Sequence, residues 1–388
     1  MTFDAIVVGA RCAGAAAALL LARTGARVLL VDKGIYGADT LSTHALMRGA
    51  VLQLERWGVL PAIVAAGTPP VRSTTFGYTA QEITVPIEPR FGVDALYAPR
   101  RALLDRVLVD AAADSGAEVR YGVRVDDLVV DDHGRVRGVS AVDAGARRVL
   151  HADLVIGADG LRSTIARLVG APCIAKGRYS AGTLYSYWDS VQSDGYSWIY
   201  GDGASIGTIP TNGATCVFAA VPSARFAREV RGHPLAAYRR WIREVSPAVD
   251  ARLEEARQLE PVRGFGGIAG YIRRSTGPGW ALLGDAGYFK DPITAHGITD
   301  ALRDAELLVR AAAKGTDAAL ADYETIRHDL SRRLFELTDE IASFTWTDDH
   351  LQSLHRAFSR EMSREVRALA ALETFPCLLR PASVPLAV

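Results

Sequence analysis

The N-terminal segment alternates short apolar runs with an alanine- and leucine-rich stretch, and this order restricts the fold more than any later feature. Ala5–Val8 is an apolar run of strand length that ends at Gly9. Ala13–Thr24 has helical composition and stops before Gly25, a residue type that commonly ends helices. Arg27–Val31 is a second apolar run. This order predicts a βαβ unit with two parallel strands.

The turn between the first strand and the helix has the spacing of a dinucleotide-binding loop. Its sequence, GARCAG at 9–14, keeps the outer glycines of the G-x-G-x-x-G fingerprint but has Arg11 at the middle glycine. Asp32 follows the second run, where the fingerprint places an acid for ribose hydroxyls. An ordinary glycine turn is the alternative. The residues that we expect to contact a dinucleotide here are Gly9, Arg11, Cys12, Ala13, Gly14, Asp32 and Lys33.

Two later strand-like runs also end in glycine–aspartate turns. Residues 152–156 lead into GADG at 157–160, and residues 279–283 lead into GDA at 284–286. A further helix is predicted to begin near residue 297. Each turn is a weak signal by itself, but their order after the N-terminal unit is typical of one nucleotide-binding fold.

With these segments the chain resembles the FAD-dependent monooxygenases of the aromatic-hydroxylase type and the related geranylgeranyl reductases and flavin halogenases. The resemblance rests on GARCAG with Asp32, on GADGLRS at 157–163 and on GDAGYFKDPITAHGITDALRDA at 284–305, and it covers residues 1 to about 315. It implies an α/β fold (α+β overall), with a Rossmann-like FAD-binding domain, an inserted antiparallel-sheet substrate domain and C-terminal helices. The W-x-W-x-I-P signature of halogenases has no match, which disfavours a halogenase.

Alternating polar and apolar runs near 81–87 and between 178 and 265 predict the half-buried antiparallel sheet. We expect the FAD-binding domain at 1–70, 96–175 and 266–325, the substrate domain at 71–95 and 176–265, and a C-terminal helical region at 326–388. Aromatic residues are frequent in the predicted sheet, which suits a flat or apolar substrate, although they could equally form the core of the sheet. The substrate-contacting candidates are Tyr185, Tyr187 and Trp198.

The resemblance also implies roles for individual residues. It implies that Asp285 binds a ribitol hydroxyl of FAD, and that Asp159 lies near the pyrophosphate and is linked to nicotinamide-cofactor use. Arg101 matches the R-x-x-L-x-x-x-L pattern of a flavin-contacting arginine, with its neighbour Arg100 or a solvated helix position as alternatives. The helix after residue 297 would direct its N-terminus at the N1–C2=O edge of the flavin and stabilise negative charge there. The further cofactor contacts that we expect are Val125, Pro292, Gly297 and Ile298.

Three more basic residues fall near the expected flavin. His44 and Arg48 are spaced by one helical turn, so both could face the flavin or both could lie on a helix surface. His296 directly precedes the helix at the flavin edge and could bind flavin, hold substrate or transfer a proton. We assign no catalytic residue, with His44 and His296 as candidates, and we expect no metal. The mixed charges between Arg356 and Glu365 predict a solvated helix face.

The overall charge excludes some classes of partner. Lys and Arg total 44 and Asp and Glu total 44, which argues against nucleic-acid or anionic-membrane binding. The apolar stretch at 13–22 is too short to span a bilayer, and the N-terminus lacks the basic region of a signal peptide. The cysteines lack metal-site spacing and predict reduced structural thiols in a cytoplasmic protein; they are Cys12, Cys173, Cys216 and Cys377.

These features together predict an FAD-dependent, NAD(P)H-dependent monooxygenase. The resemblance implies that it inserts one oxygen atom from O₂ through a C4a-hydroperoxyflavin, hydroxylating or epoxidising an aromatic or unsaturated small molecule in specialised metabolism such as antibiotic biosynthesis. No second nucleotide-binding domain is predicted, so either NAD(P)H visits the flavin transiently or a separate flavin reductase supplies reduced flavin. The alternatives are a geranylgeranyl-reductase-like FAD-dependent reductase of C=C bonds and a flavin-binding carrier without turnover.

Overall fold

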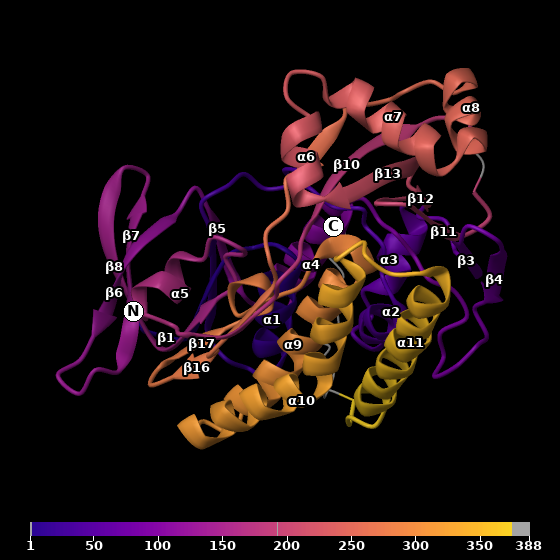
Figure 1. Ribbon diagram of the computed structural model, residues 1–388. Helices are drawn as coiled ribbons and strands as arrows, with labels where there is room; N and C mark the ends of the chain where they lie inside the picture. Colours follow the sequence, from indigo (N-terminus) through magenta and orange to yellow (C-terminus); the bar gives the residue numbers. More distant parts are fainter. Residues whose placement is uncertain (1, 192, 375–388) are drawn as a thin grey trace, which may run out of the picture.

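The computed structural model describes residues 2–191 and 193–374, which form two large sheets with helices around them (Figure 1). The first sheet has five mutually parallel strands in the order β17-β8-β1-β2-β5, and the antiparallel β16, β6 and β7 extend it. The expected βαβ unit is β1-α1-β2, and the α/β class is confirmed. The strands are β1 (Thr2–Val8), β2 (Val28–Asp32), β5 (Glu118–Tyr121), β6 (Arg124–Val130), β7 (Val136–Asp143), β8 (Ala146–Gly157), β16 (Thr276–Gly277) and β17 (Trp280–Leu282).

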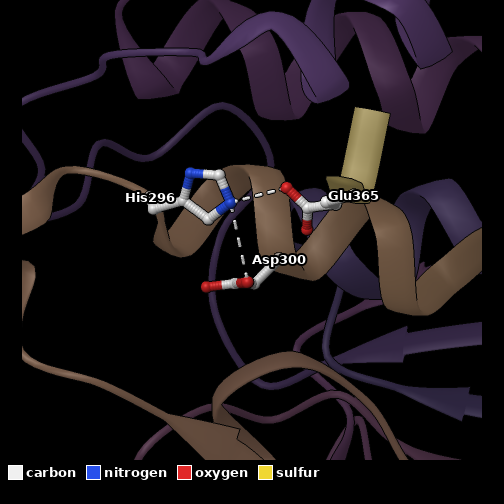
Figure 2. Close-up of side chains that lie close together, drawn as sticks. All are labelled: His296, Asp300 and Glu365. Atoms are coloured by element: carbon white, nitrogen blue, oxygen red, sulfur yellow. Dashed lines mark hydrogen bonds and ion pairs between the residues drawn. The ribbon is translucent and has the colours of Figure 1, made fainter. Parts of the chain in front are cut away.

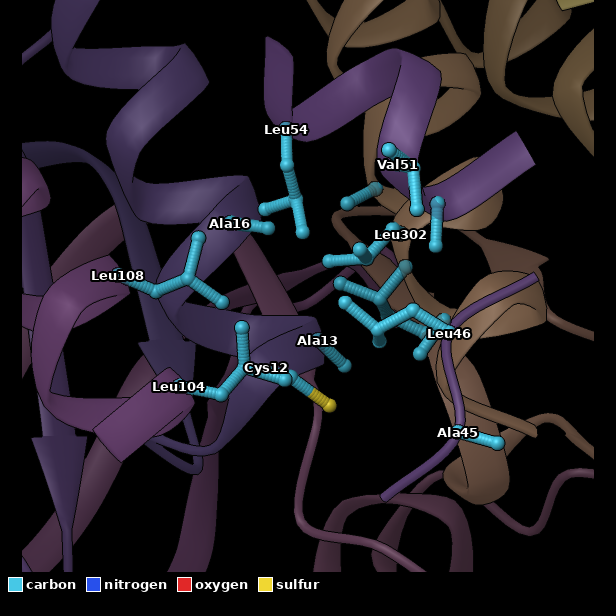
Figure 3. Packing of buried hydrophobic residues seen from close by; sticks show 14 of the residues in the cluster. Cys12, Ala13, Ala16, Ala45, Leu46, Val51, Leu54, Leu104, Leu108 and Leu302 are labelled. Atoms are coloured by element: carbon cyan, nitrogen blue, oxygen red, sulfur yellow. The ribbon is translucent and has the colours of Figure 1, made fainter. Parts of the chain in front are cut away.

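Both faces of the central part of this sheet are covered, so the runs that β1, β2, β8 and β17 contribute there are apolar. One face packs on helices, and the other packs on β6, β7 and a short helix. Figure 3 shows why α1 is rich in alanine: Ala13 and Ala16 lie close to Leu104 of α4 and Leu302 of α9, and small side chains let these helices approach. The helices named here are α1 (Cys12–Arg23), α4 (Arg101–Asp114), α5 (Thr164–Leu168) and α9 (Gly297–Ala312).

The second sheet has seven strands in the order β14-β10-β13-β12-β11-β3-β4. It is mixed and not antiparallel as expected, because β3 pairs with β11 in parallel. Only a hairpin connection forces neighbours to be antiparallel, and β3 joins β11 from a distant part of the chain. The strands are β3 (Ser73–Gly77), β4 (Glu82–Pro86), β10 (Ala181–Trp188), β11 (Tyr196–Gly201), β12 (Ala204–Thr211), β13 (Ala214–Pro222) and β14 (Arg263–Phe265).

The outer face of the second sheet is also covered, which corrects the expected half-buried sheet. Three helices that the strand pattern concealed lie over β10, β12 and β13 (Figure 1). Trp241 from these helices and Trp188 from β10 are both in the core between the two layers. Every residue of β10 is therefore buried. The helices are α6 (Ser223–Glu229), α7 (Pro234–Val245) and α8 (Pro247–Glu255).

The C-terminal part is helical as expected, and its two long helices pack against each other and near the start of the chain. α10 (Asp317–Ile341) contacts α9, and α11 (Asp348–Ala370) contacts α2 (Arg48–Arg56). No described helix is long and apolar enough to cross a membrane. Cys12 and Cys216 are buried and Cys173 is exposed; Cys377 and the C-terminal tail lie outside the described residues. The remaining elements are α3 (Leu60–Ala65), β9 (Cys173–Lys176), β15 (Tyr271–Arg273), β18 (Tyr288–Phe289) and the 3₁₀ turns η1 (Gly284–Ala286) and η2 (Pro292–Thr294).

Candidate active site

A cavity of about 770 Å³, called cavity A here, lies where the parallel strands β1, β2, β8 and β17 end. This is where ligands bind in open α/β sheets, because the helices that follow the strands direct their N-termini there. Cavity A is lined by most of the predicted cofactor-contacting residues: Gly9, Arg11, Cys12, Ala13, Asp32, Lys33, His44, Arg101, Val125, Asp159, Asp285, Pro292, Gly297 and Ile298.

The glycine turn at the floor of cavity A leaves no space for side chains. Gly9 has a positive φ of 109°, and a Cβ on it would lie 2.4 Å from the Ala158 carbonyl oxygen. A Cβ on Gly14 would lie 1.9 Å from the Gly9 carbonyl oxygen. Both contacts are with backbone, so neither neighbour can move aside easily. Gly14 therefore acts by letting α1 approach β1, while Cys12 and Ala13 of its first turn face the cavity.

Arg11 replaces the middle glycine without closing the loop. Its guanidinium donates to the carboxylate of Asp105 on α4 at 3.1 Å and to the backbone carbonyl of Ala38. The side chain is therefore held between α4 and the loop after β2, and it forms part of the cavity wall.

Asp32 closes the βαβ unit from the end of β2. Its carboxylate accepts from the backbone N–H groups of Ala10 at 2.7 Å and Gly34 at 2.6 Å. These bonds fix the carboxylate between the glycine turn and the next loop, on the wall of cavity A. Lys33 lies beside it on the same wall.

Asp285 and Arg101 add a negative and a positive charge to the wall of cavity A. No hydrogen bond from a described side chain or backbone N–H reaches the Asp285 carboxylate. Burial raises the pKa of Asp285 to about 6, although the charges of Arg101 and Lys290 oppose this. Arg101 is buried on the first turn of α4 and donates to Asp105, whereas Arg100 lies over the ring of Tyr187. Of the two arginines, Arg101 is the one that lines cavity A.

Asp159 has a different local role. Its carboxylate accepts from the Ser163 hydroxyl at 2.5 Å and from the Thr164 N–H at 2.6 Å, so it holds the N-terminus of α5 while it lines cavity A. Its link to a nicotinamide cofactor stays a prediction.

His44 is buried in the wall of cavity A and is neutral. Burial, reinforced by the charges of Arg100 and Arg101, holds its pKa well below the ordinary value. Its Nε2 is hydrogen-bonded to the Tyr187 hydroxyl, and its Nδ1 has no partner among the described residues. Arg48 does not share this place. α2 begins at Arg48 while His44 lies in the preceding loop with φ 70°, so the expected single helix face does not exist.

A second cavity of about 650 Å³, called cavity B, lies between β3, β4 and β11 on one side and α2 and α11 on the other. The segment from Ile293 to Ile298 separates the two cavities: Ala295, Gly297 and Ile298 line cavity A, and Ile293, Thr294 and His296 line cavity B. Aromatic rings form much of the wall of cavity B; they are Phe76, Tyr78, Trp198, Tyr200 and Phe358.

The predicted substrate residues are not brought to one place. Trp198 lines cavity B and Tyr185 lines cavity A, where its hydroxyl accepts from the Ser42 N–H at 3.2 Å. Tyr187 lies behind His44 and lines neither cavity. Arg48 lines cavity B and donates to the carbonyls of Glu88 and Val93, both at 2.7 Å.

A buried network of charges connects the two cavities. Arg303, with a fully buried side chain, donates to Asp300 and to Glu365 of α11, each at 2.7 Å. Lys290 pairs with Asp300, and His296 is 2.8 Å from Glu365 (Figure 2). Lys290 and Asp300 line cavity A, whereas His296 and Glu365 line cavity B.

Glu365 corrects the expected solvated helix face, because it is fully buried. The sequence contained a signal that the charge pattern hid: Leu351, Leu354, Phe358 and Leu369 mark the buried side of α11, and Glu365 is seven residues after Phe358 on that side.

His296, Asp300 and Glu365 lie close enough to surround a metal ion. Their carboxylates, however, already neutralise the buried cations Arg303 and Lys290. Each oxygen of the Asp300 and Glu365 carboxylates is already paired with Lys290, Arg303 or His296, so we assign no metal to the cluster.

The donors and acceptors of cavity A fit FAD. The narrow glycine turn with the first turn of α1 suits a pyrophosphate, and the carboxylates of Asp32 and Asp285 suit hydroxyl groups of a ligand. A family model described as an FAD binding domain matches residues 2–338. The chain belongs to this FAD-binding family.

Two curated relatives of this flavoprotein are reductases. Menaquinone reductase from Mycolicibacterium smegmatis is 29% identical over 347 residues, 83% of this chain and 78% of the relative. Digeranylgeranylglycerophospholipid reductase from Methanothrix thermoacetophila is 28% identical over 323 residues, 78% of this chain and 75% of the relative. With the family match, they identify the protein as an FAD-dependent oxidoreductase.

Two solved structures share the fold of the flavoprotein. The flavin-dependent brominase Bmp2 has a TM-score of 0.77 and 18% identity, covering 97% of this chain and 95% of its own. PqsL from Pseudomonas aeruginosa, a probable FAD-dependent monooxygenase, has a TM-score of 0.72 and 19% identity, covering 94% of this chain and 100% of its own. These likenesses confirm the fold, and the assignments of individual site residues stay predictions.

Asp32→Ala should weaken FAD binding by about 1.5–3 kcal/mol, the usual contribution of a hydrogen bond to a charged group. The substitution also frees the N–H groups of Ala10 and Gly34, which loosens the turn. Titration of apoprotein with FAD, followed by flavin fluorescence, measures the change. Asp153→Ala, an exposed position on β8, is the matched control and should bind FAD normally. Equal affinities would remove Asp32 from the cofactor site.

His355 of α11 should make the flavoprotein less stable in acid. It lines cavity B, and burial lowers its pKa to about 4, so protons prefer the unfolded state below the ordinary histidine pKa of 6.5. At pH 7 His355 is neutral in both states and its titration does not change the free energy of unfolding. At pH 5 the unfolded state binds the proton and the folded state does not, which lowers the free energy of unfolding by about 2 kcal/mol. Urea unfolding of wild type and His355→Gln at both pH values tests it. The stability advantage of wild type over the variant should shrink by that amount, and a constant advantage would contradict it.

Proposed function

We propose that this FAD-dependent oxidoreductase is a monooxygenase that inserts one oxygen atom from O₂ into an aromatic or unsaturated small molecule. The observation that carries the proposal is the common wall at 293–298, which puts an aromatic-walled cavity directly beside the cavity that fits FAD. A substrate in cavity B would therefore lie next to the reactive end of a cofactor in cavity A. Hydroxylation and epoxidation both suit this arrangement, as does a place in specialised metabolism.

Residues on the wall would hold and tune the cofactor. Asp285 and Asp32 would accept from its hydroxyl groups, Arg101 would add positive charge, and the first turn of α9 would direct free N–H groups at its negative edge. Bound FAD supplies two-electron transfer and the activation of O₂. The protein's part is to orient the two ligands and to exclude water.

NAD(P)H is the proposed source of electrons. It would reach the cofactor transiently, or a separate flavin reductase would supply reduced flavin. Anaerobic addition of NADH or NADPH to the holoprotein, monitored in the visible spectrum, distinguishes the two: rapid bleaching supports direct reduction, and a lasting oxidised spectrum with a substrate panel present supports a partner reductase.

Reduction of a C=C bond is the second candidate function, and the names of the two curated relatives favour it. Isotopically labelled O₂ separates the two. Reduced holoenzyme is given phenols and polyprenyl alkenes, and the products are weighed by mass spectrometry. Gain of one labelled oxygen atom supports the monooxygenase, and gain of two hydrogen atoms without label supports the reductase. Absence of both products across the panel would contradict both functions.

A further inference from the structure

The ring of His296 has one satisfied and one unsatisfied nitrogen. Its Nε2 lies 2.8 Å from the Glu365 carboxylate and 3.9 Å from that of Asp300. Figure 2 shows both contacts on one side of the ring, with Nδ1 on the other side. The residue is 1% exposed, and no described residue is hydrogen-bonded to Nδ1.

The tautomer of His296 follows from its partner. Burial alone would raise the pKa of Glu365, but the hydrogen bond from His296 and the positive charge of Arg303 outweigh it and hold that pKa at about 2. An ionised carboxylate only accepts hydrogen bonds, so Nε2 carries the proton. Burial lowers the pKa of His296, and the ring is neutral. Nδ1 therefore presents a bare lone pair.

A buried acceptor without a partner is costly, and such atoms are rare unless a ligand or water completes them. His296 lines cavity B, where aromatic rings surround most of the space. A flat ligand with a hydroxyl group would satisfy Nδ1 and stack on those rings.

We propose that His296, oriented by Glu365, is the general base of cavity B and takes the proton from a phenolic or enolic hydroxyl of the bound substrate. The O–H bond breaks, its electron pair stays on oxygen, and a new N–H bond forms at Nδ1. The resulting oxyanion enriches the ring in electrons, which prepares it for the oxygen transfer of the proposed function, on which this inference rests. The imidazolium keeps its proton at Nε2 toward Glu365, an arrangement that carboxylate–histidine pairs use to stabilise this charge.

Some charges around His296 stabilise its protonated ring and others destabilise it. Glu365 and Asp300 stabilise the imidazolium, whereas Arg303 and Lys290 oppose it. Arg48 lines the same cavity from α2, and Arg356 does so from α11. His350 has the same Nε2–carboxylate distance of 2.8 Å, to Glu340, but it is exposed and lines neither cavity, so it is the matched control.

Fluorine NMR of the holoprotein with para-(trifluoromethyl)phenol tests the inference, because the fluorine shift reports whether the phenol is ionised. At a pH where the free phenol is neutral, wild type should bind the probe with a larger ionised fraction than the free probe has in solution. The methyl ether of the probe, which has no proton to give, should bind more weakly. His296→Gln should bind the phenol in its neutral form, Glu365→Gln should lower the phenolate fraction, and His350→Gln should keep it.

Three results would overturn the inference: a neutral phenol bound to wild type, phenolate retained in His296→Gln, or a probe that does not bind. The wild-type spectrum alone suffices if a variant fails to fold. FAD retention and circular dichroism identify such a variant. The labelled-oxygen experiment is a separate readout, so ionised phenol without oxygen insertion would contradict the proposed function and leave His296 as a base.

Discussion

Replacing Arg303 with methionine should lower the free energy of unfolding by about 3–5 kcal/mol, the usual effect of removing one partner from a buried ion pair. The guanidinium is fully buried and donates to Asp300, Asp304 and Glu365, each at 2.7 Å. Methionine has a similar length but no donors, so the carboxylates would remain buried with only Lys290 and His296 beside them. This is the largest stability effect that we expect from one side chain.

Urea unfolding at pH 7 measures the effect of Arg303→Met, and Arg332→Met is its control. Arg332 is 78% exposed in an ion pair with Glu336 on α10, and such pairs contribute less than about 1 kcal/mol. Similar losses in both variants would show that the buried network does not stabilise the fold. Because Glu365 belongs to α11, we also expect α11 to separate from α9 first, which hydrogen exchange would detect.

Asp285→Ala should give a protein that is purified without FAD. The Asp285 carboxylate faces cavity A with no described donor, so a ligand hydroxyl is the partner that completes it. Losing a hydrogen bond to a charged group weakens the binding free energy by about 1.5–3 kcal/mol. The substitution also removes the negative charge of Asp285 that acts on Arg101.

The visible spectrum and the ratio of FAD to protein after purification measure this loss. Asp285→Asn keeps an acceptor oxygen with nearly the same shape, so it should retain more FAD than Asp285→Ala. Full retention of FAD in Asp285→Ala would exclude the ribitol assignment. Equal loss in both variants would mean that the negative charge, and not the hydrogen bond, holds the cofactor.

Local sequence was enough wherever a backbone requirement selects the residue type. Gly9 has a positive φ, and Gly14 lies where the helix and strand are too close for a side chain. The spacing of the two glycines therefore predicted the βαβ unit and the site of cavity A. The runs of β1 and β2 are apolar because both faces of their sheet are covered, and this too is readable from composition.

Charge pattern failed where a neighbour distant in sequence decides the environment. Glu365 has the charged neighbours of a solvated face, but Arg303 and His296 bury it by reaching α11 from α9 and the segment before it. The helices over the second sheet were missed for a related reason. Residues on the outer face of that sheet are buried only because these helices cover them.

The sequence by itself therefore determined the FAD-binding architecture, because steric and hydrogen-bonding demands at the glycine turns act over a few residues. The tertiary structure alone decided which polar groups meet: it joined His296 to Glu365, placed His44 against Tyr187 and left Arg48 in the other cavity. Side-chain pairing across long sequence separations depends on how the elements pack, and no local pattern of residues encodes that packing.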